Sequence, residues 1–300
     1  VLEEGNKDDW FGSPFIVRLS LIAAVALILF VAIELRVRKP LLNLRLLLRR
    51  NFGFGVVANF LMGFALYGSV FILPLYLSRV QGYNSEQIGF VLAWTGIPQL
   101  FLIPLVPQLM KRFDVRLVIG VGFALFAASN FMNITMSPDT AAPQLLRPNV
   151  VRAIGQALAF MPLTAVATAG IEPENAGSAS SLFNMMRNLG GAIGIAALQT
   201  FQIKREQFHS NVLMQAVSLM QHATRARIDM LSRYFLAHGT SDPAMAANQA
   251  VTAVGDGIRL QANVMGFSDT FYVLGCVLAI ALLATLCFRK VRPGAGAAAH

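Results

Sequence analysis

Charged side chains are scarce in this sequence. They make up 13% of its 300 residues, whereas 56% of the residues are hydrophobic and the mean hydropathy is +0.60. A soluble globular domain usually carries about a quarter charged residues, so the composition excludes an ordinary soluble domain. Several apolar runs are long enough to cross a lipid bilayer, which predicts an all-α membrane protein.

Cysteine is also rare, and the chain contains only Cys276 and Cys287. Both lie in one apolar run, at a separation that a helix would stretch to about 16 Å. A disulfide cannot bridge that distance. We therefore expect two packing residues that carry no information about the redox compartment.

The usual motifs of nucleotide, hydrolase and metal chemistry are missing. The chain has neither a G-x-x-x-x-G-K phosphate loop nor a G-x-S-x-G nucleophile elbow. Its histidines lie outside the apolar runs without metal-ligand spacing, at His209, His222, His238 and His300. The interiors of those runs contain no Asp or Glu, because Glu34 and Glu86 lie at the membrane edges, and we expect Asp269 to cap the last helix. The sequence thus predicts no enzyme, no metal and no cofactor.

The net charge of +9 at first suggests a nucleic-acid partner. However, the lysines and arginines cluster at the ends of apolar runs, where membrane topology places them. We therefore expect the lipid bilayer, and no nucleic acid, as the partner of this charge.

Seven apolar runs are predicted to span the membrane. They cover residues 15–35, 52–77, 88–110, 117–136, 147–169, 178–201 and 271–288. Between the last two, residues 204–267 carry apolar side chains at roughly helical spacing among polar ones, which predicts a helical hairpin outside the bilayer. Asp242 and Pro243 form a helix start, so the second helix of the hairpin is predicted to begin there. A solvated cap and a docking surface for a partner protein both fit this hairpin.

Positive charges give the orientation of the predicted spans. Six cations follow the first span within residues 36–50, and further clusters follow the third and seventh spans. By the positive-inside rule, segment 36–50 and the C-terminus are cytoplasmic, whereas residues 1–13 lie outside. The loop 170–177 departs from this pattern because it carries Glu172 and Glu174 and no cation. Leucines at 41, 42, 44 and 46–48 alternate with the arginines of segment 36–50, which predicts a helix in the membrane interface.

Polar side chains inside the predicted spans are the candidate functional residues. They are Asn59, Gln99, Asn130, Asn133, Arg152, Gln156, Asn184, Arg187 and Asn188. For the amides, hydrogen bonds between helices are the simpler interpretation. Arg152 lies one turn inside the predicted outer boundary, so we expect its side chain to snorkel to the interface.

Arg187 would lie about 15 Å deep in the bilayer. Burying a charge there costs about 2.5–3.5 kcal/mol, which favours a functional role for Arg187. The predicted residues for substrate binding or coupling are Arg187, Gln99, Asn184, Asn59, Gln156 and Arg152.

A weak internal repeat relates two parts of the chain at a constant offset of 88 residues. Pro74, Leu75, Gly82, Glu86 and Gly89 match Pro162, Leu163, Gly170, Glu174 and Gly177. The repeat units begin at the second and fifth spans, and this odd number of crossings inverts the second copy. Such three-plus-three inverted repeats build secondary-transporter bundles, whereas a seven-span receptor has no reason to contain one. Gln99 falls on Arg187 under the offset, so both are predicted to face the bundle interior at similar depth.

Small residues and prolines predict how the spans pack. Gly177-x-x-x-Ser181 and Gly190-x-x-x-Gly194 are small-x-x-x-small pairs that favour close helix contact. Prolines are predicted to interrupt the spans at Pro74, Pro98, Pro104, Pro107 and Pro162.

Over essentially its whole length the chain resembles the EmrB/QacA-type multidrug exporters, fourteen-span proteins of the major facilitator superfamily, and is most similar to the EmrB type. The resemblance lies in Asp9-Trp10, Phe71-Ile72-Leu73-Pro74-Leu75, Gly82-Tyr83, Phe160-Met161-Pro162-Leu163-Thr164, Glu174, Ala179-Ser180-Ser181, Arg187, Leu189, Gly191 and Gly194. Two positions depart from the family pattern. Pro107 stands where a gating loop usually has glycine, and Asn175 replaces the arginine of a Pro-Glu-Arg hinge.

The resemblance implies the C-terminal half of such an exporter. It implies an external segment 1–14, a linker helix with a cytoplasmic amphipathic loop in 15–50 and five bundle helices in 51–203. It further implies a periplasmic helical hairpin in 204–267, a last membrane helix in 268–289 and a cytoplasmic tail in 290–300. We expect the chain to be a piece of a longer protein, preceded by an N-terminal half that supplies the proton carrier.

The implied activity is proton-driven export of hydrophobic toxic compounds by alternating access, in a bacterial inner membrane. The implied partners are a periplasmic adaptor of the EmrA type and an outer-membrane channel. A non-transporting membrane scaffold or regulatory half-protein is the alternative that the residues leave open. Substrate identity cannot be read from the sequence, because apolar pockets that accept many compounds carry no residue code.

Overall fold

A computed structural model describes residues 12–37, 42–217 and 221–289 of the chain. The elements are α1 (Pro14–Arg36), η2 (Leu44–Leu48), α2 (Arg50–Arg79), α3 (Ser85–Leu102), η3 (Ile103–Leu105), α4 (Val106–Arg112), α5 (Val115–Met132), α6 (Ala142–Thr168), α7 (Pro173–Ala216), α8 (His222–Ala237) and α9 (Pro243–Thr285). The described part of the chain is therefore all-α. Most of the predicted external segment, the predicted tail and residues 38–41 lie outside the described ranges.

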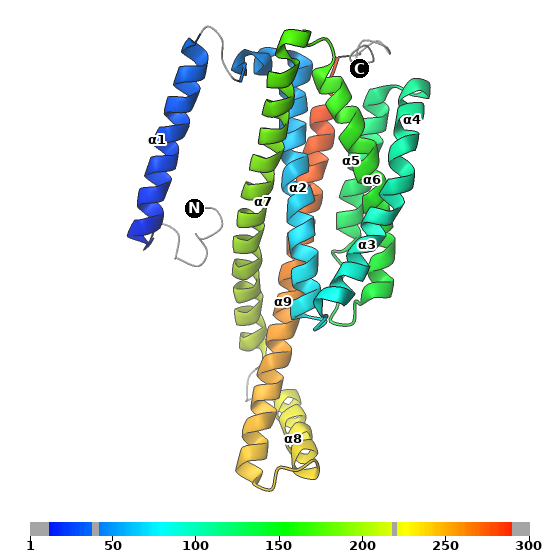
Figure 1. The fold of residues 1–300 in the computed structure, drawn as a ribbon. Coiled ribbons are helices and arrows are strands. Elements are labelled where there is room, and N and C mark those ends of the chain that lie inside the picture. The colour runs from blue at the N-terminus through cyan, green and yellow to red at the C-terminus, as the bar shows by residue number, and fades with distance from the viewer. Residues whose placement is uncertain (1–11, 38–41, 218–220, 290–300) are drawn as a thin grey trace.

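Six helical segments are long and apolar enough to cross a membrane, namely α1, α2, α3 with α4, α5, α6 and α9. The predicted span 178–201 lies inside α7, which is not among these six. It contains Asn184, Arg187 and Asn188, whose polar side chains lower its hydropathy. Nevertheless, α7 packs along α2 and α9 at one edge of the bundle, as Figure 1 shows.

The packing of the helices follows the predicted inverted repeat. The first unit is α2, α3 with α4, and α5, and the second unit is α6, α7 and α9. Helix α2 packs against α7 and α9 of the second unit, while α6 packs against α3 and α5 of the first. Helices α5 and α9 also pack on each other, as do α2 and α6. This exchange of partners is what a two-fold relation between the units produces, so the bundle has the expected three-plus-three design.

Glycines set the closest helix contact, between α2 and α7. A Cβ atom at Gly190 would overlap the Phe60 carbonyl oxygen, and one at Gly194 would lie 2.7 Å from the Phe64 carbonyl oxygen. The predicted Gly190-x-x-x-Gly194 contact is thus confirmed. The prediction for Gly177 is wrong, because a Cβ there would meet no atom within 4 Å.

Polar contacts tie the helix ends together at both ends of the bundle. At one end, Arg50 Nε and Arg116 Nη1 donate to the carbonyls of Cys287 and Phe288, at 3.0 and 2.9 Å. At the other end, the Tyr76 hydroxyl contacts the Ser137 and Thr140 carbonyl oxygens. These contacts agree with successive helices that run in alternating directions.

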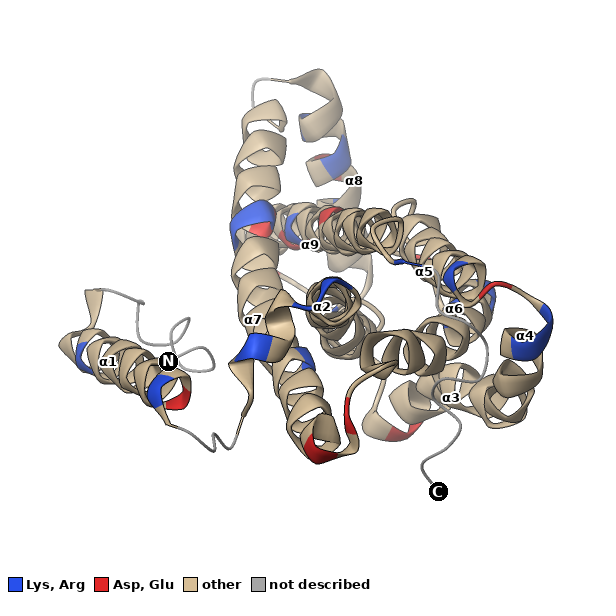
Figure 2. Cartoon of the chain, turned by 90° about the horizontal axis from the view of Figure 1, so that it is seen from above, with Lys and Arg blue, Asp and Glu red and all other residues tan. Residues whose placement is uncertain are grey.

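The linker segment before α2 is joined by polar contacts to loop 170–177. Arg49 forms an ion pair with Glu172 and also donates to the Gly170 carbonyl. The missing cation of loop 170–177 is therefore supplied by Arg49, and both segments lie at the same end of the bundle. The predicted interfacial helix is only the short η2, whose Leu46 is buried in the protein. Helix α1 stands to one side of the bundle and contacts η2 (Figure 2).

The predicted hairpin is present, but it is continuous with the membrane helices. Helices α8 and α9 pack together beyond the bundle, and the turn between them lies at 238–242 (Figure 1). As predicted, Asp242 caps α9, because its carboxylate accepts a hydrogen bond from the Ala244 backbone N–H at 3.0 Å. Helix α7 runs unbroken to Ala216 and α9 unbroken to Thr285, so no separate helix starts at Asp269. The expectation that Asp269 is a cap is wrong.

Proline breaks one span and leaves two others intact. Pro74, Pro98 and Pro162 lie inside the helices α2, α3 and α6 without breaking them, contrary to the predicted interruptions. The third span is broken as predicted, because α3 changes to η3 at Ile103 and continues as α4. Pro104 and Pro107 lie at this break, where each removes a backbone donor from the helix.

Candidate functional site

A line of polar side chains runs between α3 and α6. On α6, residues Asn149, Arg152 and Gln156 repeat at intervals of three and four, which places them on one face of the helix. Asn149 Nδ2 donates to the Val91 carbonyl at 3.3 Å, Arg152 Nη2 to Thr95 Oγ1 at 2.8 Å and Gln156 Oε1 accepts from Gln99 Nε2 at 2.6 Å. We call Asn149, Thr95, Arg152, Gln99 and Gln156 the polar ladder. It confirms interhelical hydrogen bonding for Gln99 and Gln156.

Arg152 is the charged member of the polar ladder, and its predicted snorkelling is wrong. Only 4% of the residue is exposed, and its side chain points at α3 rather than toward the membrane surface. Its Nε is buried and has no hydrogen-bond acceptor in the described protein. No ion pair to Arg152 occurs among the residues that the structure describes. The helical spacing of Asn149, Arg152 and Gln156 in the sequence was the signal that could have indicated a shared face.

Arg187 lies on α7 and reaches toward α6. Its Nη2 donates to Asn184 Oδ1 at 2.8 Å, one turn earlier on the same helix. Its guanidinium carbon lies 4.8 Å from the centre of the Phe160 ring on α6, a cation–π contact. Arg187 is half-buried and Asn184 is exposed, so this site is more open than the polar ladder.

Gln99 and Arg187 do not contact each other, but both contact α6. Gln99 bonds to Gln156, and Arg187 stacks on Phe160, which follows Gln156 by one helical turn. The two sites therefore lie within one turn of each other on α6. The prediction that Gln99 and Arg187 lie at similar depth in a membrane stays a prediction.

Asn59 lies on α2 and fixes α7 instead of facing an open site. Its Nδ2 donates to the Phe183 carbonyl at 2.6 Å, and the residue is 1% exposed. The opposite amide atom, Oδ1, is buried without a hydrogen-bond partner in the described part of the chain. Asn59 is thus the least accessible of the predicted site residues.

The cluster of Arg205, His209 and Asp269 was not predicted from the sequence, because His209 was assigned to an external loop. His209 is 8% exposed, and its Nε2 lies 2.7 Å from Asp269 Oδ2. Arg205 Nε donates to the same oxygen at 2.6 Å, so α7 and α9 are joined by three titratable side chains. The spacing of Arg205 and His209, one turn apart on α7, was a signal for a shared partner.

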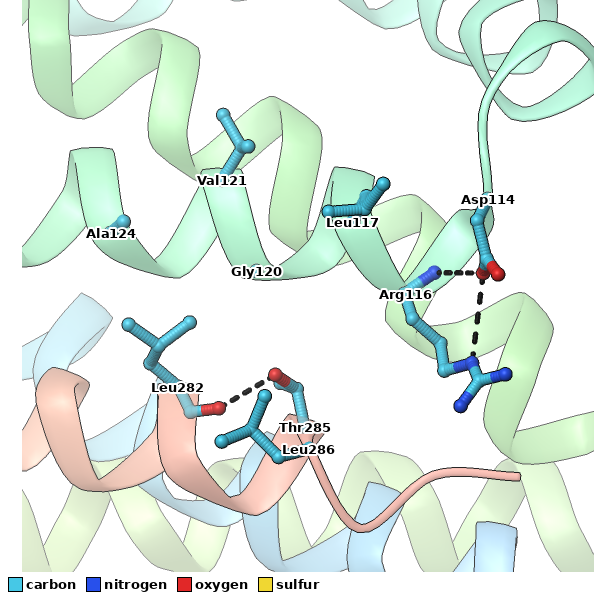
Figure 3. A pocket seen from close by; sticks show the side chains of 9 residues that line it. All are labelled: Asp114, Arg116, Leu117, Gly120, Val121, Ala124, Leu282, Thr285 and Leu286. Atoms are coloured by element: carbon cyan, nitrogen blue, oxygen red, sulfur yellow. Dashed lines mark hydrogen bonds and ion pairs between the residues drawn. The ribbon is translucent and has the colours of Figure 1, made fainter. Parts of the chain in front are cut away.

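An apolar groove lies elsewhere, between α5 and the end of α9. Figure 3 shows Leu117, Val121, Leu282 and Leu286 around it, with Asp114 and Arg116 at one end. Its volume is about 500 Å³. None of the predicted site residues lines this groove, so we do not assign it to the candidate site. Among His, Cys, Asp and Glu side chains of the described ranges, no group of three could hold a metal ion.

Two inverted three-helix units with polar side chains in apolar helices define the class, which is that of a multi-span membrane transporter. The chain belongs to the major facilitator superfamily, whose family profile (Major Facilitator Superfamily) matches residues 9–195. This family and fold are those of transporters and not of enzymes.

Curated relatives support the EmrB-type resemblance. The chain is 27% identical to the multidrug export protein EmrB of Escherichia coli K12 over 297 residues, which are 99% of this chain and 56% of that protein. It is 26% identical to the colistin resistance protein EmrB of Acinetobacter baumannii over 95% of the chain and 55% of the relative. The fatty acid resistance protein FarB of Neisseria gonorrhoeae is 29% identical to the chain, over 100% of this chain and 57% of that protein. The chain thus spans about half the length of these relatives.

A solved structure supports the fold independently. A bacterial homologue of the human lysosomal transporter Spinster, in an inward-facing and unoccupied conformation, superposes with a TM-score of 0.56. The match covers 83% of this chain and 51% of that one at 16% sequence identity. At this identity the likeness concerns the fold alone.

Proposed function

We propose that this chain forms the C-terminal part of a proton-coupled multidrug exporter that moves hydrophobic toxic compounds by alternating access. The observation that carries the proposal is the surrounding of Arg187. Its guanidinium lies over the ring of Phe160, and Phe160 and the next residue of α6, Met161, are 40% and 41% exposed. An exposed aromatic face beside one fixed charge suits compounds that differ in shape.

The side chains on this face have the right chemistry for varied ligands. Methionine is unbranched and polarizable, so Met161, the exposed neighbour of Phe160 on α6, can adapt to different shapes. Arg187 presents several hydrogen-bond donors in a planar group. The printed names of the relatives, which include multidrug export, colistin resistance and fatty acid resistance, agree with apolar or amphipathic substrates.

The proton carrier is proposed to lie in the N-terminal part of the full-length protein. Most acidic side chains of the described bundle lie at helix ends or in loops. Two lie inside helices, Glu206 on α7 and Asp269 on α9, and Asp269 is paired with Arg205. An unpaired carboxylate in the other half is the better carrier.

Partners and orientation are proposed from the same argument. The hairpin of α8 and the start of α9 extends beyond the bundle, and on the predicted orientation it projects into the periplasm. It is proposed to dock an EmrA-like adaptor, which would join the transporter to an outer-membrane channel. The C-terminus is proposed to be cytoplasmic, in agreement with the cations near it.

The proposal is tested by expressing the full-length gene in a bacterial strain that lacks its major exporters. We expect increased resistance to hydrophobic toxic compounds, lower dye accumulation and loss of both when the proton gradient is collapsed. Residues 1–300 expressed alone should insert into the membrane without conferring export. Export by the full-length protein that persists without a proton gradient would contradict proton coupling, and normal abundance with no export would favour a scaffold.

A further inference from the structure

The guanidinium of Arg152 has fewer partners than a buried cation needs. Arg152 lies between α3 and α6, where 4% of the residue is exposed, and its Nη2 donates to Thr95 Oγ1 at 2.8 Å. Its Nε–H is buried and has no acceptor among the described residues. A buried charge that lacks an opposite charge is strongly unfavourable, so buried charges in proteins are usually paired.

The helices around Arg152 do not supply an opposite charge. Helix α6 packs mainly on α2, α3 and α5. Within these four helices the one acidic residue is Glu86, which lies more than two turns before Thr95 on α3. The other side chains of the polar ladder are neutral. In the part of the chain that the structure describes, the site therefore carries an uncompensated positive charge.

The side chains beside Arg152 offer further hydrogen-bond donors. Thr95 Oγ1 accepts from Arg152, so the hydroxyl of Thr95 still has its own proton to donate. Gln156, one turn after Arg152 on α6, accepts from Gln99 through Oε1 and keeps the NH2 group of the same amide as a donor. Together with the Nε–H of Arg152, these groups form a donor set of the kind that binds an anion.

We propose that Arg152 binds a small inorganic anion with a single charge, chloride, as its counter-ion inside the bundle. One guanidinium balances one negative charge, so a doubly charged anion such as sulfate would leave an excess charge at the site. The 4% exposure of Arg152 gives no open path to an organic molecule, whereas a single-atom ion needs only a small opening. The inference concerns the bundle itself and does not depend on which compound the protein exports.

Water and an internal acid account less well for the site. A water molecule can accept the Nε–H of Arg152, but it cannot neutralise the guanidinium, so the cost of the buried charge would remain. A carboxylate from the rest of the full-length protein would have to enter between α3 and α6, which pack on each other within this chain. A free ion does not have this restriction.

The packing of α3 gives an ion a way to reach Arg152. Helix α3 packs mainly on α6, and 11% of the most apolar stretch of α3 with α4 is buried, against 56% of that of α6. The same span is interrupted at η3, where Pro104 removes a backbone donor. A small outward movement of α3 would open the polar ladder while α2, α5 and α6 stay packed together.

The test uses the purified full-length protein and the variant Arg152→Gln, with Arg147→Gln as the matched control. Arg147 is an exposed arginine near the start of α6, so its replacement removes the same charge without changing the polar ladder. Thermal unfolding is measured while sodium chloride replaces sodium gluconate at constant ionic strength. Gluconate carries the same single charge as chloride but is too large for this enclosed site.

We expect chloride to raise the unfolding temperature of the wild type and of Arg147→Gln by about 2–4 °C, because an ion that binds the folded state stabilises it. Bromide should act like chloride, since its charge is the same and its size is similar. The unfolding temperature of Arg152→Gln should be the same in chloride and gluconate, because a neutral amide does not hold an anion in an apolar bundle.

The variant Thr95→Val tests the donor set while it keeps the charge of Arg152. It should raise the chloride concentration that gives half of the temperature shift by about tenfold, the loss expected on removing one hydrogen bond to a charged group. This variant also decides the question if Arg152→Gln does not fold.

Three results would overturn the inference. Equal unfolding temperatures of the wild type in chloride and gluconate would show that water or an internal carboxylate satisfies Arg152. A chloride shift that persists in Arg152→Gln would indicate an adventitious ion only, bound elsewhere on the protein. An unchanged half-point concentration in Thr95→Val would exclude the polar ladder as the binding site.

Discussion

Arg152 and Arg187 are both cations on helices of an apolar bundle, but their surroundings differ. Arg152 is enclosed between two helices and bonds to Thr95, whereas Arg187 lies on a more open face beside Phe160. Depth estimated from the sequence suggested the opposite order of burial. The difference arises because burial depends on which helix covers a residue and not on its distance from the end of a span.

Replacing Arg187 tests its proposed role at the level of one residue. In the full-length protein, Arg187→Ala should reduce export about tenfold or more, because it removes the fixed charge and the contact with Phe160. Arg187→Lys should restore export only in part, since lysine lacks the planar fork. Export and membrane abundance are measured together, with Arg79→Ala at the end of α2 as a control for loss of surface charge. Loss of export together with loss of membrane abundance would instead indicate that Arg187 has a structural role.

At the scale of helices, glycine contacts give the α2–α7 pair its close packing. Gly190→Ala should lower the free energy of unfolding by about 1–3 kcal/mol, because the new methyl group overlaps the Phe60 carbonyl oxygen. Gly96→Ala on α3 is the matched control, since its methyl group meets no atom within 4 Å. It should be neutral or stabilising by up to about 1 kcal/mol, as alanine favours the helix. Thermal unfolding of the purified variants checks both values, and equal effects would contradict the difference in packing between α3 and α7.

The ion pair between Arg49 of the linker and Glu172 of loop 170–177 should depend on pH. The hydrogen bond from Arg49 holds the pKa of Glu172 below its ordinary value of 4.5. A carboxylate with a lowered pKa contributes its full effect above pH 4.5 and loses it as the pH falls through the folded-state pKa. The ion pair is therefore expected to persist at neutral pH and to be lost only in acid.

Spin labels at Leu48 and Gly177, which are both exposed, can report the distance between the linker and loop 170–177. Their distance distribution should be constant from about pH 5 to 8 and broaden below pH 4.5. Glu172→Gln should give the broad distribution at every pH, whereas Glu174→Gln should behave like the wild type. A distribution that ignores pH in the wild type would show that the ion pair does not hold the loop.

At the scale of the whole molecule, the two ends of the bundle are predicted to lie on opposite sides of the membrane. Cysteines introduced at Asn43 and Asp242 should react from opposite sides with a reagent that cannot cross the bilayer, Asn43 from the cytoplasm. The native Cys276 and Cys287 are replaced by serine for this measurement. Labelling of both positions from one side would overturn the orientation and the path of α7 through the membrane.

The sequence by itself determined the helices and their class. Bilayer thickness sets the length of apolar runs, and a backbone in lipid must satisfy its own hydrogen bonds, so these runs could form only helices in a membrane bundle. The offset between the halves indicated the inverted repeat because related units keep residues at corresponding positions. The start of α9 at Asp242 was also predictable, since a cap followed by Pro243 is a local signal.

Only the tertiary structure decided which side chains meet across helices. The sequence placed Asn149, Arg152 and Gln156 on one face of α6, but it could not show that α3 covers this face and buries Arg152. Nor could it show that α7 and α9 bring His209 to Asp269, because the two residues lie 60 positions apart. Local spacing defines the face of a helix, whereas its partner depends on how all helices share the available apolar surface.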